Sequence, residues 1–110
     1  MPSESVSPET VHKAAQRLRA LSDEIRIRLL LRLRKGEANV GALVAEFRIA
    51  QASMSKHLAI LKAVGYVQNR REGAQSVYGI RDETVFDILK TTFDEVRNDH
   101  IALAKAMGGE

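Results

Sequence analysis

The chain has 110 residues, 45% of them hydrophobic, and a net charge of +3, which indicates one folded domain with a core rather than a disordered tail. It has no cysteine, which excludes disulfides, thiolate metal ligands and iron–sulfur clusters. It has no apolar run of the about 18 residues that a membrane span needs, and its start, MPSESVSPE, is unlike a secretory signal; we therefore expect a cytoplasmic protein without a membrane partner.

The positive charge is concentrated in one part of the chain. Residues 12–71 contain 13 Lys and Arg against 4 Asp and Glu, a local balance of +9, whereas residues 72–110 contain 4 against 8. A basic body with an acidic C-terminal end suggests a polyanionic partner for the basic part. The alternative is an ordinary solvated surface of charged side chains.

The first helix is predicted over residues 7–21. Ser7 can cap it, and Pro8 suits the first helical position. Apolar residues then recur at helical spacing, at Val11, Ala14, Ala15, Leu18 and Leu21.

The segment IRIRLLLRLR, residues 25–34, has two interpretations. Its apolar residues alternate as in a strand. However, Leu and Arg are strong helix formers, Ser22 and Asp23 offer a cap before it, and Gly36 follows as a stop. These signals favour a helix.

Two shorter helices follow. Asn39 can cap the third, whose apolar face is Val40, Leu43, Val44 and Phe47. Residues 48–50 connect it to a fourth helix, 51–64, which Gly65 ends. The apolar face of the fourth helix is formed by Met54, Leu58 and Leu61.

The pattern then changes to two short strands, residues 66–71 and 76–80, joined by a turn over 72–75 that contains Gly73. Asp82 is the predicted cap of a long last helix that extends to residue 107.

Two helices joined by a tight turn and followed by a β-hairpin form the winged helix-turn-helix plan. The predicted fold is therefore mainly α with a small β-hairpin: about five helices plus a two-stranded wing. Residues 1–110 form a single domain, with the helix-turn-helix at 39–65 and the wing at 66–81.

This plan leaves the polar face of the fourth helix free to enter the DNA major groove. Gln51 and Ser53 lie in its first turn, where base edges are usually read, and Ser55 and Lys56 can reach phosphates or bases. His57 borders the apolar face, and we assign it either a structural role or a phosphate contact. On the wing we predict DNA contacts from three further residues, namely Arg70, Arg71 and Gln75.

The runs LRALSDEIRIRLLLRLRKGEANVGALVAEF and SMSKHLAILKAVGYVQNRREGAQSVYGI closely resemble the ArsR/SmtB family of winged-helix repressors. The most specific parts are Ser55-Lys56-His57-Leu58 and the wing segment from Arg71 to Tyr78. The resemblance implies a helix at 25–34. It also implies a homodimer that binds a double-stranded inverted-repeat operator, usually as a repressor, and an inducer of unidentified chemistry that releases the DNA.

The residues themselves also indicate a dimer, because the first and last helices (7–21 and 82–107) carry apolar stripes that one small core cannot cover. Two-fold pairing places the two reading helices roughly 34 Å apart, one turn of DNA. The alternative is that the stripes close the core of the monomer. The predicted interface residues are Val11, Ala15, Leu18, Val85, Leu89, Thr92, Val96, His100 and Leu103.

Metal binding and catalysis receive little support, and we predict no cofactor. One family metal site uses cysteines at the start of the third helix, which are absent here. Of the four ligands of a second site, only Asp87 and His100 match; the other two positions are Leu89 and Leu103. No phosphate-binding loop, nucleophile elbow or HExxH motif is present, so we expect no enzyme. The remaining alternatives are a metal- or small-ligand-responsive sensor with an unusual site, and a winged helix that binds proteins.

Overall fold

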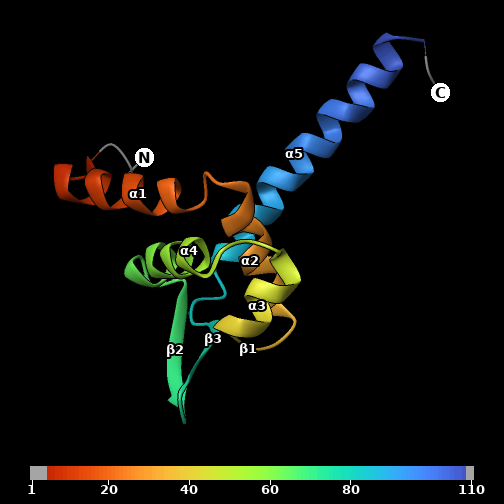
Figure 1. The fold of residues 1–110 in the computed structure, drawn as a ribbon. Helices are drawn as coiled ribbons and strands as arrows, with labels where there is room; N and C mark the ends of the chain where they lie inside the picture. The colour runs from red at the N-terminus through yellow and green to blue at the C-terminus, as the bar shows by residue number, and fades with distance from the viewer. Residues whose placement is uncertain (1–4, 109–110) are drawn as a thin grey trace.

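The computed structural model describes residues 5–108. Its three middle helices pack against a small antiparallel sheet whose β-hairpin extends as the wing, while the first and last helices project away (Figure 1). The elements are α1 (Pro8–Ala20), α2 (Glu24–Arg34), β1 (Ala38–Asn39), α3 (Val40–Phe47), α4 (Gln51–Ala63), β2 (Val67–Glu72), β3 (Gln75–Ile80) and α5 (Val85–Ala106).

Polar side chains begin the first three helices, as the sequence predicts. Ser7 accepts from the Thr10 N–H at 3.1 Å to cap α1. Asp23 and Asn39 likewise accept backbone N–H bonds at the starts of α2 and α3. The prediction that Asp82 caps the last helix was wrong, because Thr84 occupies the cap position. The Asp82 carboxylate instead accepts from the backbone N–H and the hydroxyl of Thr84, forming a turn before the helix.

Residues 25–34 are helical, which resolves the ambiguity of their alternating pattern. Leu29, Leu30 and Leu33 are buried, whereas Leu31 is 38% exposed. A strand would place Leu29 and Leu31 on the same face, whereas the helix directs them to different sides.

The hydrophobic core lies where α2, α3, α4 and the sheet meet. The predicted apolar face of α4 is confirmed, since Met54, Leu58 and Leu61 are all 0% exposed. Outside this core, the Arg32 guanidinium on α2 donates to both carboxylate oxygens of Glu46 on α3, at 2.7 and 3.3 Å. These contacts fix α3 and α4 on the scaffold provided by α2.

The wing is more extensive than the two strands predicted from the sequence. The sheet has three antiparallel strands in the order β1-β3-β2, and the short β1 pairs Ala38 with Tyr78 and Asn39 with Val77. The sequence signal for β1 was missed because two residues are too few to show alternation. The hairpin turn is also tighter than predicted, since Glu72 pairs with Gln75 and only Gly73 and Ala74 lie between them. Gly73 has a φ of 62°, which glycine adopts without steric cost.

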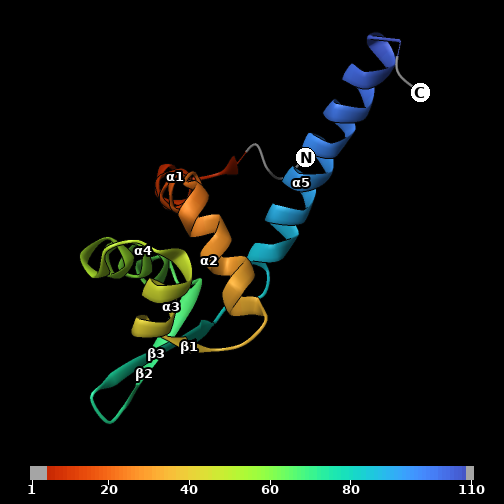
Figure 2. The same cartoon turned by 45° about the vertical axis from the view of Figure 1, so that its right-hand side comes forward.

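The first and last helices extend away from this body (Figures 1 and 2). In α1 the only buried residue is Ala20, at its C-terminal end. In α5 the buried residues are Val85, Phe86 and Leu89, all in its first turns. The prediction that Val85 and Leu89 face a second copy was wrong, because the core of the same chain covers them. None of the described helices is long and apolar enough to cross a membrane.

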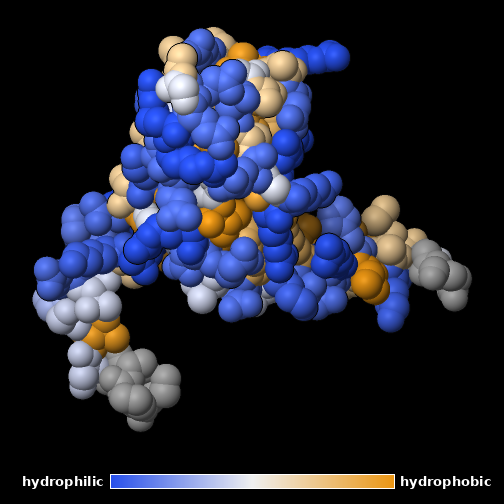
Figure 3. All heavy atoms as spheres, turned by 90° about the horizontal axis from the view of Figure 1, so that it is seen from below, coloured by the Kyte–Doolittle hydropathy of each residue, from blue (hydrophilic) through white to orange (hydrophobic). Residues whose placement is uncertain are grey.

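The remaining part of the α5 stripe stays uncovered. Val96 is 49% exposed and Leu103 60%, and on α1 Val11 and Leu18 are 56% and 57% exposed. Figure 3 shows a mostly hydrophilic face, with hydrophobic residues at the surface of the arm that α5 forms. The structure therefore leaves apolar side chains of both helices available for contacts outside the chain.

The helical state of α2 can be tested with a matched pair of substitutions. We expect Leu29→Ala to lower the free energy of unfolding by about 2–5 kcal/mol, because it opens a cavity in the core. Leu31→Ala removes a partly exposed side chain and should cost less than about 1 kcal/mol. Urea unfolding measures both values. Equal losses would contradict the helix, since only a strand places both residues on one face.

Candidate nucleic-acid interface

One face of α4 is open to solvent. Because the opposite face is anchored in the core, the rotation of the helix about its own axis is fixed, and its polar residues lie outward. The exposed residues of α4 are Gln51, Ala52, Ser53, Ser55, Lys56, Ala59, Lys62 and Ala63. Apart from Gln51 and two lysines, these side chains are short, so a polyanion can approach the helix closely.

The start of α4 also leaves backbone groups available. Ala50 occupies the cap position and provides no side-chain hydrogen bond. The N–H groups of the first turn therefore lack the side-chain acceptor that Ser or Asp would supply. Such a helix start carries partial positive charge and favours phosphate oxygens.

A groove of about 300 Å³ lies between the starts of α3 and α4 and the turn end of the wing. Four predicted DNA contacts line it together: Gln51 and Ser55 from α4, and Arg71 and Gln75 from the wing. Gln51 and Ser55 are one helical turn apart and so share a face. Residues distant in sequence thus form one surface that combines amide, hydroxyl and guanidinium groups.

Asn39 is a groove residue that sequence reasoning missed as a functional candidate. Its side-chain oxygen caps α3, while its Nδ2 donates to the Gln75 side-chain oxygen at 2.8 Å. One amide therefore joins the start of α3 to the wing. The sequence signal was the ability of Asn to donate and accept at once, but the partner on the wing is 36 residues away.

Arg70 and Arg71 are adjacent but have different surroundings, since neighbouring side chains of a strand point to opposite faces. Arg71 lines the groove. The Arg70 guanidinium donates to Glu37 and to Glu72, each at 2.6 Å, and the hydrogen bond to Glu37 raises the pKa of Arg70. Gly79 leaves room for Glu37, because a Cβ there would meet the Glu37 side chain at 3.0 Å. Arg70 thus contributes to holding the wing.

His57 points toward the body of the protein. Its side chain is 16% exposed, and its Nδ1 lies 3.1 Å from Arg26 Nη1 on α2. Because arginine only donates, Nδ1 is the acceptor in this contact. Arg26 also donates to the Ala20 carbonyl at the end of α1, at 2.7 Å. Of the two roles assigned to His57, this geometry fits the structural one.

Asp23 completes this group beside His57. Burial raises the pKa of Asp23, but the hydrogen bond from the Arg26 backbone N–H and the positive charge of Arg26 bring the pKa below its ordinary value. The carboxylate, 3.9 Å from His57 Nδ1, is therefore charged at neutral pH. Through this group, α4 is connected to both α1 and α2.

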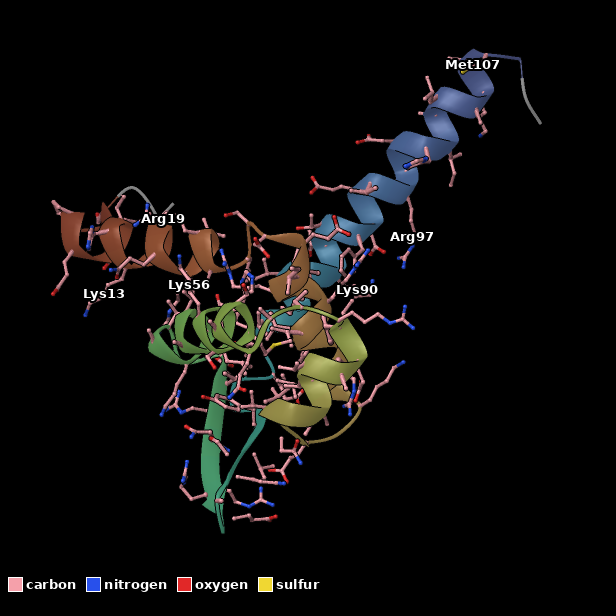
Figure 4. All side chains as sticks on the ribbon, in the orientation of Figure 1. Lys13, Arg19, Lys56, Lys90, Arg97 and Met107 are labelled. Carbon is pink, nitrogen blue, oxygen red and sulfur yellow. The ribbon has the colours of Figure 1, made fainter. Side chains whose placement is uncertain are left out.

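Ser53 and Lys56 are exposed on α4 but do not line the groove. In Figure 4, Lys56 lies on the side of α4 nearer α1, and the wing extends from the opposite side. The positive charge of Lys56 is therefore separated from that of Arg71, so the two can contact different parts of an extended polyanion.

Asp87 and His100, the two residues that match a family metal site, lie on the same helix thirteen residues apart, about 20 Å along its axis. One chain therefore cannot bring them to one ion. Within residues 5–108 no three His, Asp or Glu side chains gather as metal ligands do.

Comparison with known proteins agrees with this geometry. A sequence model of the family "Bacterial regulatory protein, arsR family" matches residues 23–69. The transcriptional repressor SmtB of Mycobacterium tuberculosis is 36% identical over 81 residues, 74% of this chain, and the chain spans 60% of that repressor. The arsenical resistance operon repressor of Bacillus subtilis is 30% identical over 82 residues, which cover 74% of this chain and 78% of that protein.

A solved structure gives the same result for the fold. The homodimeric winged helix-turn-helix DNA-binding domain of a possible ArsR-family regulator from Mycobacterium bovis superposes with a TM-score of 0.74 at 27% identity, covering 87% of this chain and 94% of that one. These relatives are transcriptional regulators and not enzymes. The predicted resemblance and the winged-helix fold class are thus confirmed, and the chain belongs to the arsR family of bacterial transcriptional regulators.

Proposed function

We propose that this protein binds a double-stranded DNA operator sequence-specifically as a homodimer and represses transcription, without catalysing a reaction. The observation that carries the proposal is the groove in which Gln51, Ser55, Arg71 and Gln75 converge beside the exposed face of α4. Because the partner is chromosomal DNA, the proposed compartment is the bacterial cytoplasm.

In this proposal the first turn of α4 reads base edges in the major groove. The Gln51 amide can donate to and accept from adenine, and the Ser55 hydroxyl can serve several bases. Phosphates supply most of the affinity and are contacted by Arg71, Lys56 and the uncapped N–H groups of α4. Ser53, exposed in the first turn, is a further candidate contact.

The proposed dimer is formed by α1 and α5. The side chains involved are those of the predicted interface that the chain's own core does not cover, namely Val11, Ala15, Leu18, Thr92, Val96, His100 and Leu103. A two-fold axis between such helices presents two α4 helices to successive major grooves. An inverted-repeat operator mirrors that symmetry.

Phosphate contact predicts a uniform loss of affinity. We expect Arg71→Ala or Lys56→Ala to weaken binding to operator and random DNA alike, and to reduce the slope of log K against log salt by about one unit each. Lys90→Ala is the control, because Lys90 lies on α5, away from α4 and the wing, and its side chain already donates to Asp94 at 2.7 Å. Fluorescence anisotropy across a salt series measures these values. A loss for Lys90→Ala as large as that for Arg71→Ala would contradict the assignment.

Base reading predicts a loss of discrimination. With DNA selected from a random pool by the unaltered protein, Gln51→Ala should reduce discrimination at one base pair per half-site by about 1–3 kcal/mol. Gln16→Ala, an exposed glutamine of α1, serves as the control. Competition binding with single-base operator variants checks this. A uniform loss across all variants would instead place Gln51 among the phosphate contacts.

Dimer formation predicts sensitivity to charge on one side of α5 only. Leu103→Asp should shift the protein toward monomers, because it buries an unpaired carboxylate in the interface. Asn98→Asp adds the same charge on the opposite side of the helix and should leave the dimer intact. Sedimentation velocity distinguishes the two. A dimer that tolerates Leu103→Asp, or fails with Asn98→Asp, would exclude this face.

A further inference from the structure

A cavity of about 430 Å³ lies between α1 and the start of α5, with Tyr66 at its base. Its size falls within the range of about 300–1,000 Å³ that small-molecule sites occupy. It is separate from the groove assigned to DNA, because the two share no lining residue. The residues that line it are Thr10, Lys13, Ala14, Arg17, Leu18, Tyr66, Asp82, Thr84 and Ile88.

Tyr66 is 2% exposed, and its hydroxyl makes no hydrogen bond with any described residue. Yet every fully buried side-chain nitrogen or oxygen within residues 5–108 has a hydrogen-bond partner. The Tyr66 hydroxyl is therefore not fully enclosed by protein, and it is accessible from the cavity that Tyr66 lines. Burial raises the pKa of Tyr66, so at neutral pH the hydroxyl is a protonated donor. A nearly buried hydroxyl donor usually has a hydrogen-bond acceptor, and here only the cavity can supply one.

Two cationic side chains, Lys13 and Arg17, lie one helical turn apart on the α1 side of this cavity. Arg17 forms no ion pair and no side-chain hydrogen bond within residues 5–108, and Lys13 has only a long, exposed contact with Glu9 at 3.8 Å. Both are thus available to an anion.

Asp82 is the one carboxylate in the lining, and it is already engaged. It accepts from the Thr84 hydroxyl at 2.6 Å and from the Thr84 backbone N–H at 3.0 Å. The hydrogen bond from the Thr84 hydroxyl, together with the charge of Arg17, lowers the pKa of Asp82. The formal charge of the lining, with Lys13 and Arg17 against Asp82, is still positive.

The remaining walls are apolar. Ala14 and Leu18 come from α1 and Ile88 from α5. Leu18 is 57% exposed and Ile88 41% exposed, so a ligand with a hydrocarbon body would shield surface that water now contacts. The cavity therefore combines an apolar wall with one hydroxyl donor and two cations.

We propose that this cavity is a binding site for a small organic carboxylate with a compact apolar body. The carboxylate accepts from the Tyr66 hydroxyl and pairs with Arg17, while the hydrocarbon part lies against Leu18 and Ile88. Binding here does not rest on the DNA-binding function. The competing occupant is a second copy of the chain, because Leu18 also belongs to the proposed dimer face.

Tyrosine emission provides a local probe of this site, because the chain has two tyrosines and no tryptophan. Tyr78→Phe leaves Tyr66 as the reporter. We would titrate this dimeric protein with cyclohexanecarboxylate, which does not absorb near the tyrosine band, at constant ionic strength. A saturable change in emission in the millimolar range or tighter is expected. The neutral cyclohexanecarboxamide, which has the same body, should bind at least tenfold more weakly.

Calorimetry of variants assigns the binding to these residues. Tyr66→Phe removes only the hydroxyl, and Arg17→Gln removes only the charge; each should weaken carboxylate binding about tenfold or more. Arg19→Gln is the matched control and should change nothing, since in Figure 4 Arg19 lies on the side of α1 opposite Lys13. Circular dichroism verifies that each variant is folded.

Three results would overturn the proposal. The first is an absence of saturable cyclohexanecarboxylate binding to the folded dimer. This includes the case in which only the Leu103→Asp monomer binds the carboxylate, because a second copy of the chain would then fill the cavity in the dimer. The second is equal binding of the carboxamide. The third is unchanged affinity in both Tyr66→Phe and Arg17→Gln. DNA binding is measured separately, so its loss or retention leaves these outcomes distinct.

Discussion

The burial of one face of α4 is the constraint on which the candidate interface depends. Met54, Leu58 and Leu61 are fully enclosed, and the helix contacts α2, α3 and β2. Rotating α4 about its axis would expose three large apolar side chains, each worth about 1.5–3 kcal/mol of burial. The orientation of its polar face is therefore set by the core. Gln51 and Ser55 lie beside the wing for that reason.

The wing is positioned by contacts that are individually weak. Surface ion pairs such as Arg70–Glu37 are screened by solvent and contribute little to stability, so their main effect is orientation. Together with the Asn39–Gln75 hydrogen bond and the pairing of β1 with β3, they hold the hairpin against the start of α3. Arg71 then projects from a rigid strand. Less conformational entropy is lost when such a side chain contacts a polyanion than when a mobile loop presents it.

The α5 stripe serves two purposes along its length. Its first turns complete the core through Val85 and Leu89, and the same stripe then continues past the body with Val96 and Leu103 exposed. A helix of 22 residues is about 33 Å long, more than the small core beneath it can cover. The cavity at Tyr66 lies where α5 leaves the core beside α1. A ligand there would contact both helices of the proposed dimer.

The sequence by itself determined the order of the helices and of the two hairpin strands, the caps at Ser7, Asp23 and Asn39, and the apolar face of α4, because helical periodicity and capping are local properties. It could not show that Arg70 and Arg71 have different partners, that His57 faces Arg26, or that Val85 belongs to the core. Those outcomes depend on residues far apart in the chain, such as Glu37 for Arg70. Only the tertiary structure decides them, because adjacent side chains of the same type point in different directions. Their contacts depend on which distant residues the fold brings to each side.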